Sequence, residues 1–535
     1  MIQQRQQYYK TLQEFLSSSQ YDCTFLKINL QQPSLDQQEG SNLGEGIQKY
    51  TNLQRAVFNL QERYIGDEGI SLFASGLATC ASIQILTLNL VYNNISNLGS
   101  TNLGSALSKL VNLSNLLLML DQNEISDQGI SCLAQRLGEC TNLSNLRLYL
   151  MDNQIGDQGL SCLGNNLAKC QKLTILKVFL QYNKISSHGI SSMVSGLAKL
   201  NQISTLKLDF NRVLFDDQGL QDLAQELSKC TNLSTLKLLF GWAQIRCKGV
   251  SCLIEGLSRC NKLNSLTLGL ECNKIGDQDT SSLLFGLIQN INLQVLDLNL
   301  VHNKIGDDRI QQLSSELASC ANLSTLILNL NGNEISSKGV SDLGIDLSRC
   351  NSLQCLSIEL CENLINGQGL LNLVIGLQKC SQLSNLSFDF SQNQISDLSG
   401  QDFGQALAQC RNLSTLKLTL DKTNISHLSA QELGFGLAKC SKLSFLTLYL
   451  CSNTIGEQGF KDLISKLTKS TSILILKLFL WELYIKKAYF QKLNLQIHKM
   501  KRLVQFNLIN SFSNYFQTQD SDEEDIKLEE NESEF

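Results

Sequence analysis

A period of thirty residues runs through most of the chain and constrains its fold more than any other feature of the sequence. Residues 141–170 read TNLSNLRLYLMDNQIGDQGLSCLGNNLAKC, and segments 231–260 and 321–350 fall into the same frame. Fifteen full repeats begin at residue 51 and at every thirtieth residue up to 471, with weaker copies at 21 and 501. A chain of 535 residues usually divides into several globular domains, but a continuous repeat stacks into one elongated array.

Each repeat carries two successive hydrophobic patterns. In the reference repeat 141–170, apolar residues first alternate with polar or aromatic ones, at Leu146, Leu148 and Leu150. This period of two predicts a half-buried strand. Apolar side chains then recur at i, i+4 and i+7, which predicts one buried face of a helix, at Leu163, Leu167 and Cys170. Asp157 stands at the start of that helix and is predicted to be its N-cap.

The combined pattern L-x-L-x-x-N-x-I and D-x-G-x-x-x-L-x-x-x-L resembles the leucine-rich repeat of the ribonuclease-inhibitor type. The resemblance covers roughly residues 21–510 and implies an α/β leucine-rich-repeat solenoid (horseshoe) of about 15 full repeats of 30 residues plus caps. It implies a parallel β-sheet on the concave face and helices on the convex face. The Gln- and Asn-rich composition, with one proline, also resembles large repeat arrays of ciliate-type genomes.

The resemblance also implies a role for the asparagine of each turn, Asn153 in the reference repeat. In that family, the side chain hydrogen-bonds backbone groups at the turn and forms a ladder along the array. Other residues occupy this position in five repeats, at Arg63, Val213, Ala243, Thr423 and Leu483. Because two of these replacements lie in neighbouring repeats, we expect a local irregularity at Val213 and Ala243.

The expected domain organisation is an N-terminal cap with a degenerate first repeat (1–50), the repeat array (51–500), a C-terminal cap (501–515) and a tail (516–535). Residues 520–535 contain nine acidic residues and one lysine, a charge of −8, so the tail is predicted to be disordered. Ser521 precedes three acidic residues and resembles a substrate of acid-directed kinases. Two other roles stay open: the tail keeps the chain soluble, or it folds back over basic residues of the array.

Composition limits the class of partner and the compartment. The net charge is −5, and removing the −8 of the tail leaves +3 on the rest, which argues against a general nucleic-acid binder. No apolar stretch is long enough to span a membrane, and residues 1–20 lack the apolar core of a secretory signal. The chain is therefore expected to be cytoplasmic or nuclear, to have no contact with membranes, and to be monomeric.

Cysteine usage supports a reducing compartment. Ten of the nineteen cysteines share one repeat position, where neighbouring copies are expected to lie about a helix-packing distance apart, too far for a disulfide. We therefore expect small buried thiols at these positions. The ten are Cys80, Cys140, Cys170, Cys230, Cys260, Cys320, Cys350, Cys380, Cys410 and Cys440.

No catalytic, metal or cofactor site is predicted, and no small-molecule substrate. The four histidines lie in different repeats without an i, i+4 pair, and no glycine-rich phosphate-binding motif is present. A DFG tripeptide at 402–404 resembles the metal-binding motif of protein kinases. Phe403, however, falls on the apolar helix position that Leu163 occupies in the reference repeat, so the match is interpreted as a coincidence.

Basic and aromatic residues meet on the predicted concave face. The residue after the first strand leucine is basic in four successive repeats, at Arg147, Lys177, Lys207 and Lys237. Neighbouring strands lie about 4.8 Å apart, where unopposed like charges repel each other, so a random surface would rarely line up four cations. Exposed aromatic side chains are expected beside them, at Tyr149 and Phe179 on the strands and at Tyr182 and Trp242 in the turns. Exposed aromatic groups beside cations are typical of protein-binding surfaces. The alternative is that the lysines only keep the sheet soluble.

Farther along the array, residues that face outward become acidic. We expect a second part of the partner surface at Glu271, Glu359 and Glu362, near Asp297 and Asp389. The inner face would then carry opposite charges in its two halves.

The leading hypothesis is a non-catalytic scaffold that binds partner proteins on the concave face. The alternative is a GTPase activator, because Ran GTPase-activating proteins resemble this chain in combining such repeats with an acidic segment; Arg63 and Arg212 lie near turns where they would reach a nucleotide. A third reading is an enzyme inhibitor similar to ribonuclease inhibitor, whose inner face is acidic, whereas half of this one is basic. RNA binding is disfavoured because the basic strip is short.

Overall fold

The computed structural model describes residues 6–30, 37–276, 283–284, 286, 292–395, 400–480, 493, 495, 497, 500 and 502–509. The predicted tail 516–535 with Ser521, and the ladder position Leu483, lie outside the described residues. The chain divides into two compact units, Met1–Ile275 with Asp279–Leu293 and Gly276–Gln278 with Gln294–Phe535. We call them the first and the second unit and describe each by itself.

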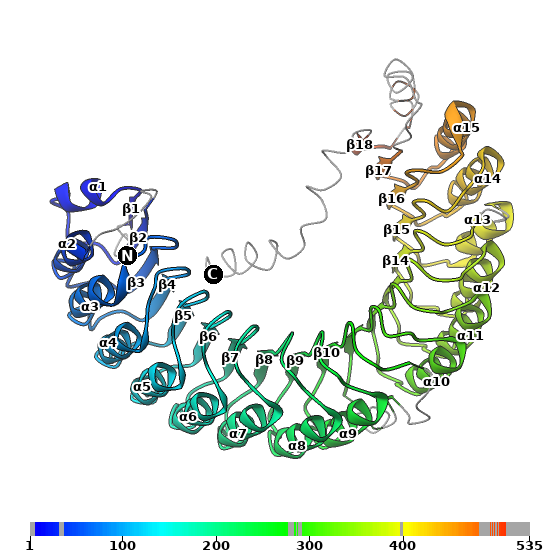
Figure 1. Ribbon diagram of the computed structural model, residues 1–535. Helices are drawn as coiled ribbons and strands as arrows, with labels where there is room; N and C mark the ends of the chain where they lie inside the picture. Colours follow the sequence, from blue (N-terminus) through cyan, green and yellow to red (C-terminus); the bar gives the residue numbers. More distant parts are fainter. Residues whose placement is uncertain are drawn as a thin grey trace. The chain divides into compact units, whose positions relative to one another are not determined.

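In the first unit, short strands alternate with helices (Figure 1). Its described strands are β1 (Gln6–Tyr9), β2 (Phe25–Asn29), β3 (Arg55–Asn59), β4 (Ile85–Asn89), β5 (Asn115–Met119), β6 (Asn145–Tyr149), β7 (Ile175–Phe179), β8 (Thr205–Asp209), β9 (Thr235–Leu239) and β10 (Ser265–Gly269). Its described helices are α1 (Leu12–Ser17), α2 (Gln37–Ile47), α3 (Gly66–Leu77), α4 (Asn97–Leu107), α5 (Asp127–Leu137), α6 (Asp157–Leu167), α7 (Ser187–Leu197), α8 (Asp217–Leu227) and α9 (Cys247–Leu257).

The second unit repeats the same alternation. Its described strands are β11 (Val295–Asn299), β12 (Thr325–Asn329), β13 (Cys355–Glu359), β14 (Asn385–Asp389), β15 (Thr415–Thr419), β16 (Phe445–Tyr449), β17 (Ile475–Phe479) and β18 (Gln505–Ile509). Its described helices are α10 (Asp307–Leu317), α11 (Ser337–Leu347), α12 (Gly367–Leu377), α13 (Gly400–Gln409), α14 (His427–Leu437) and α15 (Gly456–Leu467).

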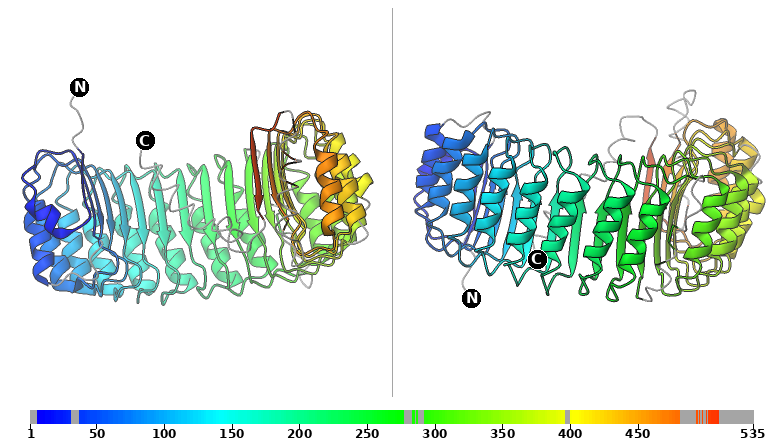
Figure 2. Two further views of the ribbon diagram at one scale, coloured as in Figure 1. Left: turned by 90° about the horizontal axis from the view of Figure 1, so that it is seen from above. Right: turned by 60° about the horizontal axis from the view of Figure 1, so that its bottom comes forward.

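Within each unit, every strand pairs in parallel with the next strand of the sequence, and from β2 onward partners are thirty residues apart, as Leu146 pairs with Leu176. The helices lie in a row along one face of the sheet (Figures 1 and 2). We call the opposite sheet face the open face; it corresponds to the face predicted to be concave. The predicted α/β solenoid with alternating strands and helices is therefore confirmed.

Burial follows the two predicted periods. Leu146 and Leu148 of β6 are fully buried, as are Leu163 and Leu167 of α6. The residues between the strand leucines are partly exposed on the open face. Phe403 of α13 is also fully buried, which supports a core role for the DFG tripeptide. The apolar core of each repeat thus lies between its strand and its helix.

The asparagine ladder is present. Asn123 Oδ1 accepts hydrogen bonds from the backbone N–H groups of Asn93 (3.1 Å) and Ile95 (2.9 Å) in the preceding repeat. Its Nδ2 donates to the backbone oxygens of Leu90, Leu120 and Asp121, each at 3.0 Å. Each such amide therefore satisfies buried backbone groups of two repeats, as polar groups in a core require.

Two of the replaced ladder positions keep part of this bonding. The Arg63 guanidinium donates to the backbone oxygen of Leu30 at 2.6 Å, thirty-three residues back, as Asn93 does to Leu60. Thr423 Oγ1 donates to Leu420 O at 2.7 Å. Val213 and Ala243 are buried apolar side chains without an amide, so the predicted irregularity lies in the turns that contain them.

The structure corrects the predicted capping role of Asp157. Asp157 is the first residue of α6. The N-cap is Gly156, which has no side chain to accept a hydrogen bond from the first turn. The Asp157 carboxylate instead accepts the backbone N–H of Ser186 at 2.7 Å, and Asp127 accepts those of Gly156 (2.6 Å) and Gly159 (3.0 Å). Each aspartate therefore caps the helix of the following repeat, because the parallel stacking places that helix start beside it.

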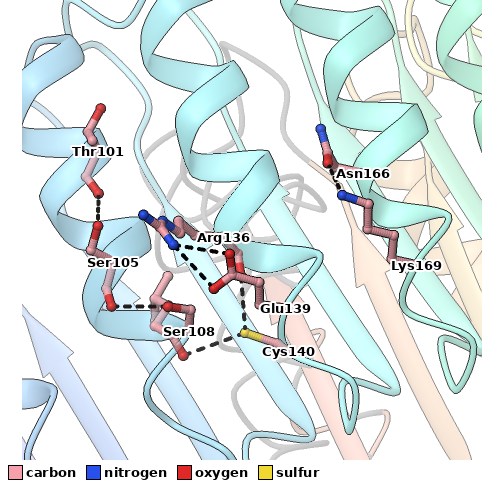
Figure 3. Close-up of polar contacts among 9 residues, drawn as sticks. Thr101, Ser105, Ser108, Arg136, Glu139, Cys140, Asn166 and Lys169 are labelled. Atoms are coloured by element: carbon pink, nitrogen blue, oxygen red, sulfur yellow. Dashed lines mark hydrogen bonds and ion pairs between the residues drawn. The ribbon is translucent and has the colours of Figure 1, made fainter.

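The shared cysteine position forms a second ladder, on the helix side of the sheet. None of the nineteen cysteines, all of which lie in the described ranges, forms a disulfide bond, and Cys140 Sγ donates to Leu107 O at 3.5 Å in the preceding repeat (Figure 3). Cys170 makes the corresponding bond to Leu137 O at 3.3 Å. Burial raises the pKa of the Cys170 thiol to about 11, so the thiol stays protonated and remains a donor.

Pairs of glycines let neighbouring helices touch through their backbones. A Cβ on Gly196 of α7 would lie 2.4 Å from the carbonyl carbon of Gly164 of α6. The same arrangement occurs at three more seams: Gly44 with Gly76, Gly344 with Gly376, and Gly404 with Gly436. Side chains of any size are excluded there, since real Cβ atoms do not approach backbone this closely.

Candidate functional site

The four predicted cations lie in register on four adjacent strands of the first unit. Strands β6 to β9 lie side by side (Figure 1). Arg147 of β6 pairs with Lys177 of β7, which pairs with Lys207 of β8, which pairs with Lys237 of β9. All four are partly exposed on the open face, because the aliphatic residues on either side of each one point into the core. We call these four residues the basic strip.

A stacked aromatic pair lies beside the basic strip. Tyr149 and Phe179 occupy paired positions of β6 and β7, and their rings are 4.1 Å apart and 11° from parallel. Lys207 Nζ lies 4.6 Å from the centre of the Phe179 ring. The structure corrects the expectation that Phe179 is exposed: only 9% of it is accessible, because Tyr149 and Lys207 cover it.

Tyr182 and Trp242 lie in the turns after β7 and β9 and are 52% and 55% exposed, as predicted. Between them, in the turn after β8, lies Arg212. Its Cζ is 5.4 Å from the centre of the Tyr182 ring and 4.8 Å from that of Trp242. We call these three residues the arginine clamp. Sequence reasoning named its two aromatic members but assigned Arg212 only to the GTPase alternative, because stacking between turns is not visible in one repeat.

The predicted acidic residues lie in both units. Glu271 follows β10 in the first unit, where burial raises the pKa of its carboxyl group. In the second unit, Glu359 Oε2 accepts hydrogen bonds from Asn329 Nδ2 (2.6 Å) and Asn331 Nδ2 (3.2 Å). Burial, with the neighbouring Asp389 acting in the same direction, raises the pKa of Glu359. Glu362 is exposed, and its Oε1 accepts from Gln392 Nε2 at 2.7 Å.

The described part of the chain contains no group of three or more His, Cys, Asp or Glu side chains placed to hold a metal ion. Across the same residues, we find no helix with the length and apolar character needed to cross a membrane.

Comparison with solved structures finds the same architecture elsewhere. A leucine-rich-repeat protein of Leptospira interrogans matches 93% of this chain and 99% of its own, with a TM-score of 0.51 and 18% sequence identity. The chain folds as a leucine-rich-repeat solenoid. No known family pattern matches its sequence, and no curated protein matches it significantly. A similarity at 18% sequence identity establishes the fold alone. The function therefore has to be argued from the surface of this solenoid.

The solenoid carries a second aromatic pair that sequence reasoning missed. In the second unit, Tyr449 of β16 and Phe479 of β17 stack at 4.0 Å and 10°, and Lys417 Nζ lies 5.7 Å from the Tyr449 ring. These residues stand 300 positions after Tyr149 and Phe179, so reading the outward strand positions to the end of the array would have found them. The second unit also has basic residues at outward strand positions, Lys417 and Lys477. The expectation that the two halves of the inner face carry opposite charges is therefore corrected.

Two buried carboxyl groups lie in the first unit of the solenoid. Asp209 pairs with Phe179 across β8 and β7 and is 5% exposed; burial raises its pKa to about 6, although Lys207 acts against the shift. Asp121 follows β5, and its Oδ1 accepts the N–H of Met151 at 2.7 Å. Burial raises the pKa of Asp121 to about 7.

Asp121 is expected to make the stability of the solenoid depend on pH. Folding raises its pKa from the ordinary 3.8 to about 7, so the folded chain keeps a proton that the unfolded chain has lost. Stability therefore falls as the pH rises through this window. Asp121→Asn, which keeps the acceptor for Met151 N–H, should raise the free energy of unfolding at pH 8 by on the order of 1 kcal/mol and leave it unchanged below pH 4. Urea unfolding at both pH values checks this, and an equal effect at both would contradict it.

Proposed function

We propose that this leucine-rich-repeat chain, of the ribonuclease-inhibitor type, is a non-catalytic scaffold that binds an acidic surface of a partner protein. The observation that carries the proposal is the basic strip, four cations on four adjacent strands beside the Tyr149–Phe179 pair. Parallel strands at about 4.8 Å place these four basic side chains close together, which matches the charge of an acidic partner surface. The first unit would provide the binding surface.

Charge and ring exposure favour a protein over a nucleic acid. Proteins that bind single strands use a long basic groove with successive aromatic faces free for the bases. Here Phe179 is covered, and the basic strip spans only β6 to β9. An acidic protein surface fits this short strip, since paired charges at an interface favour the correct partner and speed its association. The proposed compartment is the cytoplasm or the nucleus.

The arginines considered for GTPase activation have other contacts. Arg63 donates to Leu30 O in the position of a ladder asparagine, and Arg212 stacks between Tyr182 and Trp242. No observation among the described residues favours GTPase activation, so we propose binding alone.

The test is affinity capture from the source cells with wild type and a variant in which Arg147, Lys177, Lys207 and Lys237 are all changed to Glu. We expect the variant to fold, because these side chains point away from the core, and to bind the captured partner at least about tenfold more weakly. Binding of the purified partner is then measured by titration at low and physiological salt, since a charge-driven contact weakens as salt rises.

A matched variant controls for net charge. It changes four exposed lysines in turns on the helix side of the same unit to Glu: Lys169, Lys172, Lys199 and Lys262. It has the same total charge change but leaves the open face intact, so it should retain the partner. Equal loss in both variants, or in neither, would show that the basic strip is not the binding surface.

A further inference from the structure

We propose that Arg212 of the arginine clamp is a receptor for one carboxylate group of an acidic, extended segment on the partner protein. This proposal rests on the proposed function and deepens it, because it assigns a chemical group to one contact. The clamp lies at the edge of the sheet, in turns that follow β7, β8 and β9, three of the four strands that carry the basic strip.

The backbone of the three turns holds the clamp side chains at a fixed spacing. Tyr182, Arg212 and Trp242 all have left-handed φ angles, of 57°, 63° and 61°, so their side chains leave equivalent points of successive turns. Arg212 N donates to Gly241 O at 2.8 Å, and Trp242 N donates to Glu271 O at 2.9 Å. These bonds tie each turn to the next and place the guanidinium between the two rings.

The stacking leaves the hydrogen-bonding edge of Arg212 available. Arg212 Cζ lies over both rings, and contact with a ring face uses the flat face of a guanidinium, whereas its five N–H donors lie in its plane. Arg212 is exposed, and within the described ranges its guanidinium has no hydrogen-bond acceptor and no ion-pair partner. A planar, immobilised fork of donors matches the two oxygens of a carboxylate.

The neighbouring charges favour an acidic peptide as the occupant. Lys207 of β8 and Lys237 of β9 lie on the two strands that lead into the turns of Arg212 and Trp242, so one extended segment would contact both the strip and the clamp. A phosphate group usually collects several converging cations or N–H donors. The clamp offers a single guanidinium, so a carboxylate is the better match.

The clamp also lies where the asparagine ladder is interrupted. Val213 and Ala243 follow Arg212 and Trp242 directly, and neither supplies the amide that braces the other turns. A cation–ring contact at an exposed site contributes a stabilisation comparable to that of a hydrogen bond. The stack therefore supports these two turns and holds Arg212 rigid, which lowers the entropy lost when a ligand binds.

Tryptophan fluorescence tests the proposal on the full chain. Trp242 and Trp481 are the only tryptophans, so Trp481→Phe leaves Trp242 as the sole indole reporter. This protein is titrated with a short capped peptide of alternating Glu and Gly, with the Gln–Gly counterpart, and with a phosphoserine–Gly counterpart. We expect the Glu peptide to change the Trp242 emission and the Gln peptide to have no effect. Arg212→Lys, which keeps the charge but loses the planar fork, should weaken binding of the Glu peptide about tenfold.

Arg136→Lys is the matched control, because Arg136 is an exposed arginine on the helix side that pairs with Glu139 (Figure 3). It should leave the titration unchanged, and urea unfolding should show that both variants are folded. The proposal is overturned if Arg212→Lys binds the Glu peptide as tightly as its parent, if the Glu peptide leaves the emission unchanged, or if the phosphoserine peptide binds tenfold more tightly. In the first case a loss of partner in the strip variant would still support the proposed function.

Discussion

Asn123→Val is expected to lower the free energy of unfolding of the first unit by roughly 3 kcal/mol, the largest effect we expect from one side chain. The change removes five hydrogen bonds, two accepted from Asn93 and Ile95 and three donated to backbone oxygens. Asn123 is buried, so water cannot replace them. Urea unfolding followed by circular dichroism measures the effect.

Asn123→Thr is the graded control for this prediction. The natural Thr423 already donates to the oxygen three residues back, as Asn123 does to Leu120. A threonine should therefore keep one of the five bonds and lose less stability than valine does. If valine and threonine unfold at the same urea concentration as wild type, the ladder is not a source of stability.

Gly196→Ala is expected to destabilise the first unit by about 2 kcal/mol, although the same change in an exposed helix stabilises by about 1 kcal/mol. The new Cβ would lie 2.4 Å from the carbonyl carbon, 2.6 Å from the oxygen of Gly164 and 2.7 Å from the nitrogen of Asn165. These are backbone atoms, so α6 and α7 would have to separate. Urea unfolding measures both the sign and the size of the change.

The equivalent position one repeat earlier provides the comparison. Asn166 of α6 already carries a Cβ, and its amide contacts Cys162 O and Lys169 (Figure 3). Asn166→Ala should change the free energy of unfolding by less than about 0.5 kcal/mol, as surface changes usually do. A stabilising Gly196→Ala would show that the two helices can move apart without cost.

Features set within one repeat were predictable from the sequence. The alternation at Leu146 and Leu148 and the helical spacing of Leu163 and Leu167 depend only on local geometry, and the structure confirms them. The buried thiol of Cys170 follows from the same helical face. For the candidate site, the register of the basic strip was also predictable, because the repeat length fixes which residues pair.

Features that depend on contact between repeats were not predictable in the same way. The capping direction of Asp157 is set by the following helix, which a single repeat does not contain. The burial of Phe179 depends on Tyr149 and Lys207 from two other strands. The position of Arg212 between two rings depends on three turns at once.

Asparagine and aspartate side chains, which recur at two fixed positions in many of the repeats, reach in opposite directions along the chain. Asn123 bonds the backbone of the repeat before it, whereas Asp127, four residues later, bonds the first turn of the helix after it. A repeat of this kind therefore receives an asparagine side chain from the repeat that follows it and an aspartate carboxylate from the repeat that precedes it. Excising one repeat cleanly would restore both links, but an insertion or deletion of any other length would break both. The array can thus lengthen or shorten by whole repeats, and both links form again wherever the repeats at the new junction carry this asparagine and this aspartate.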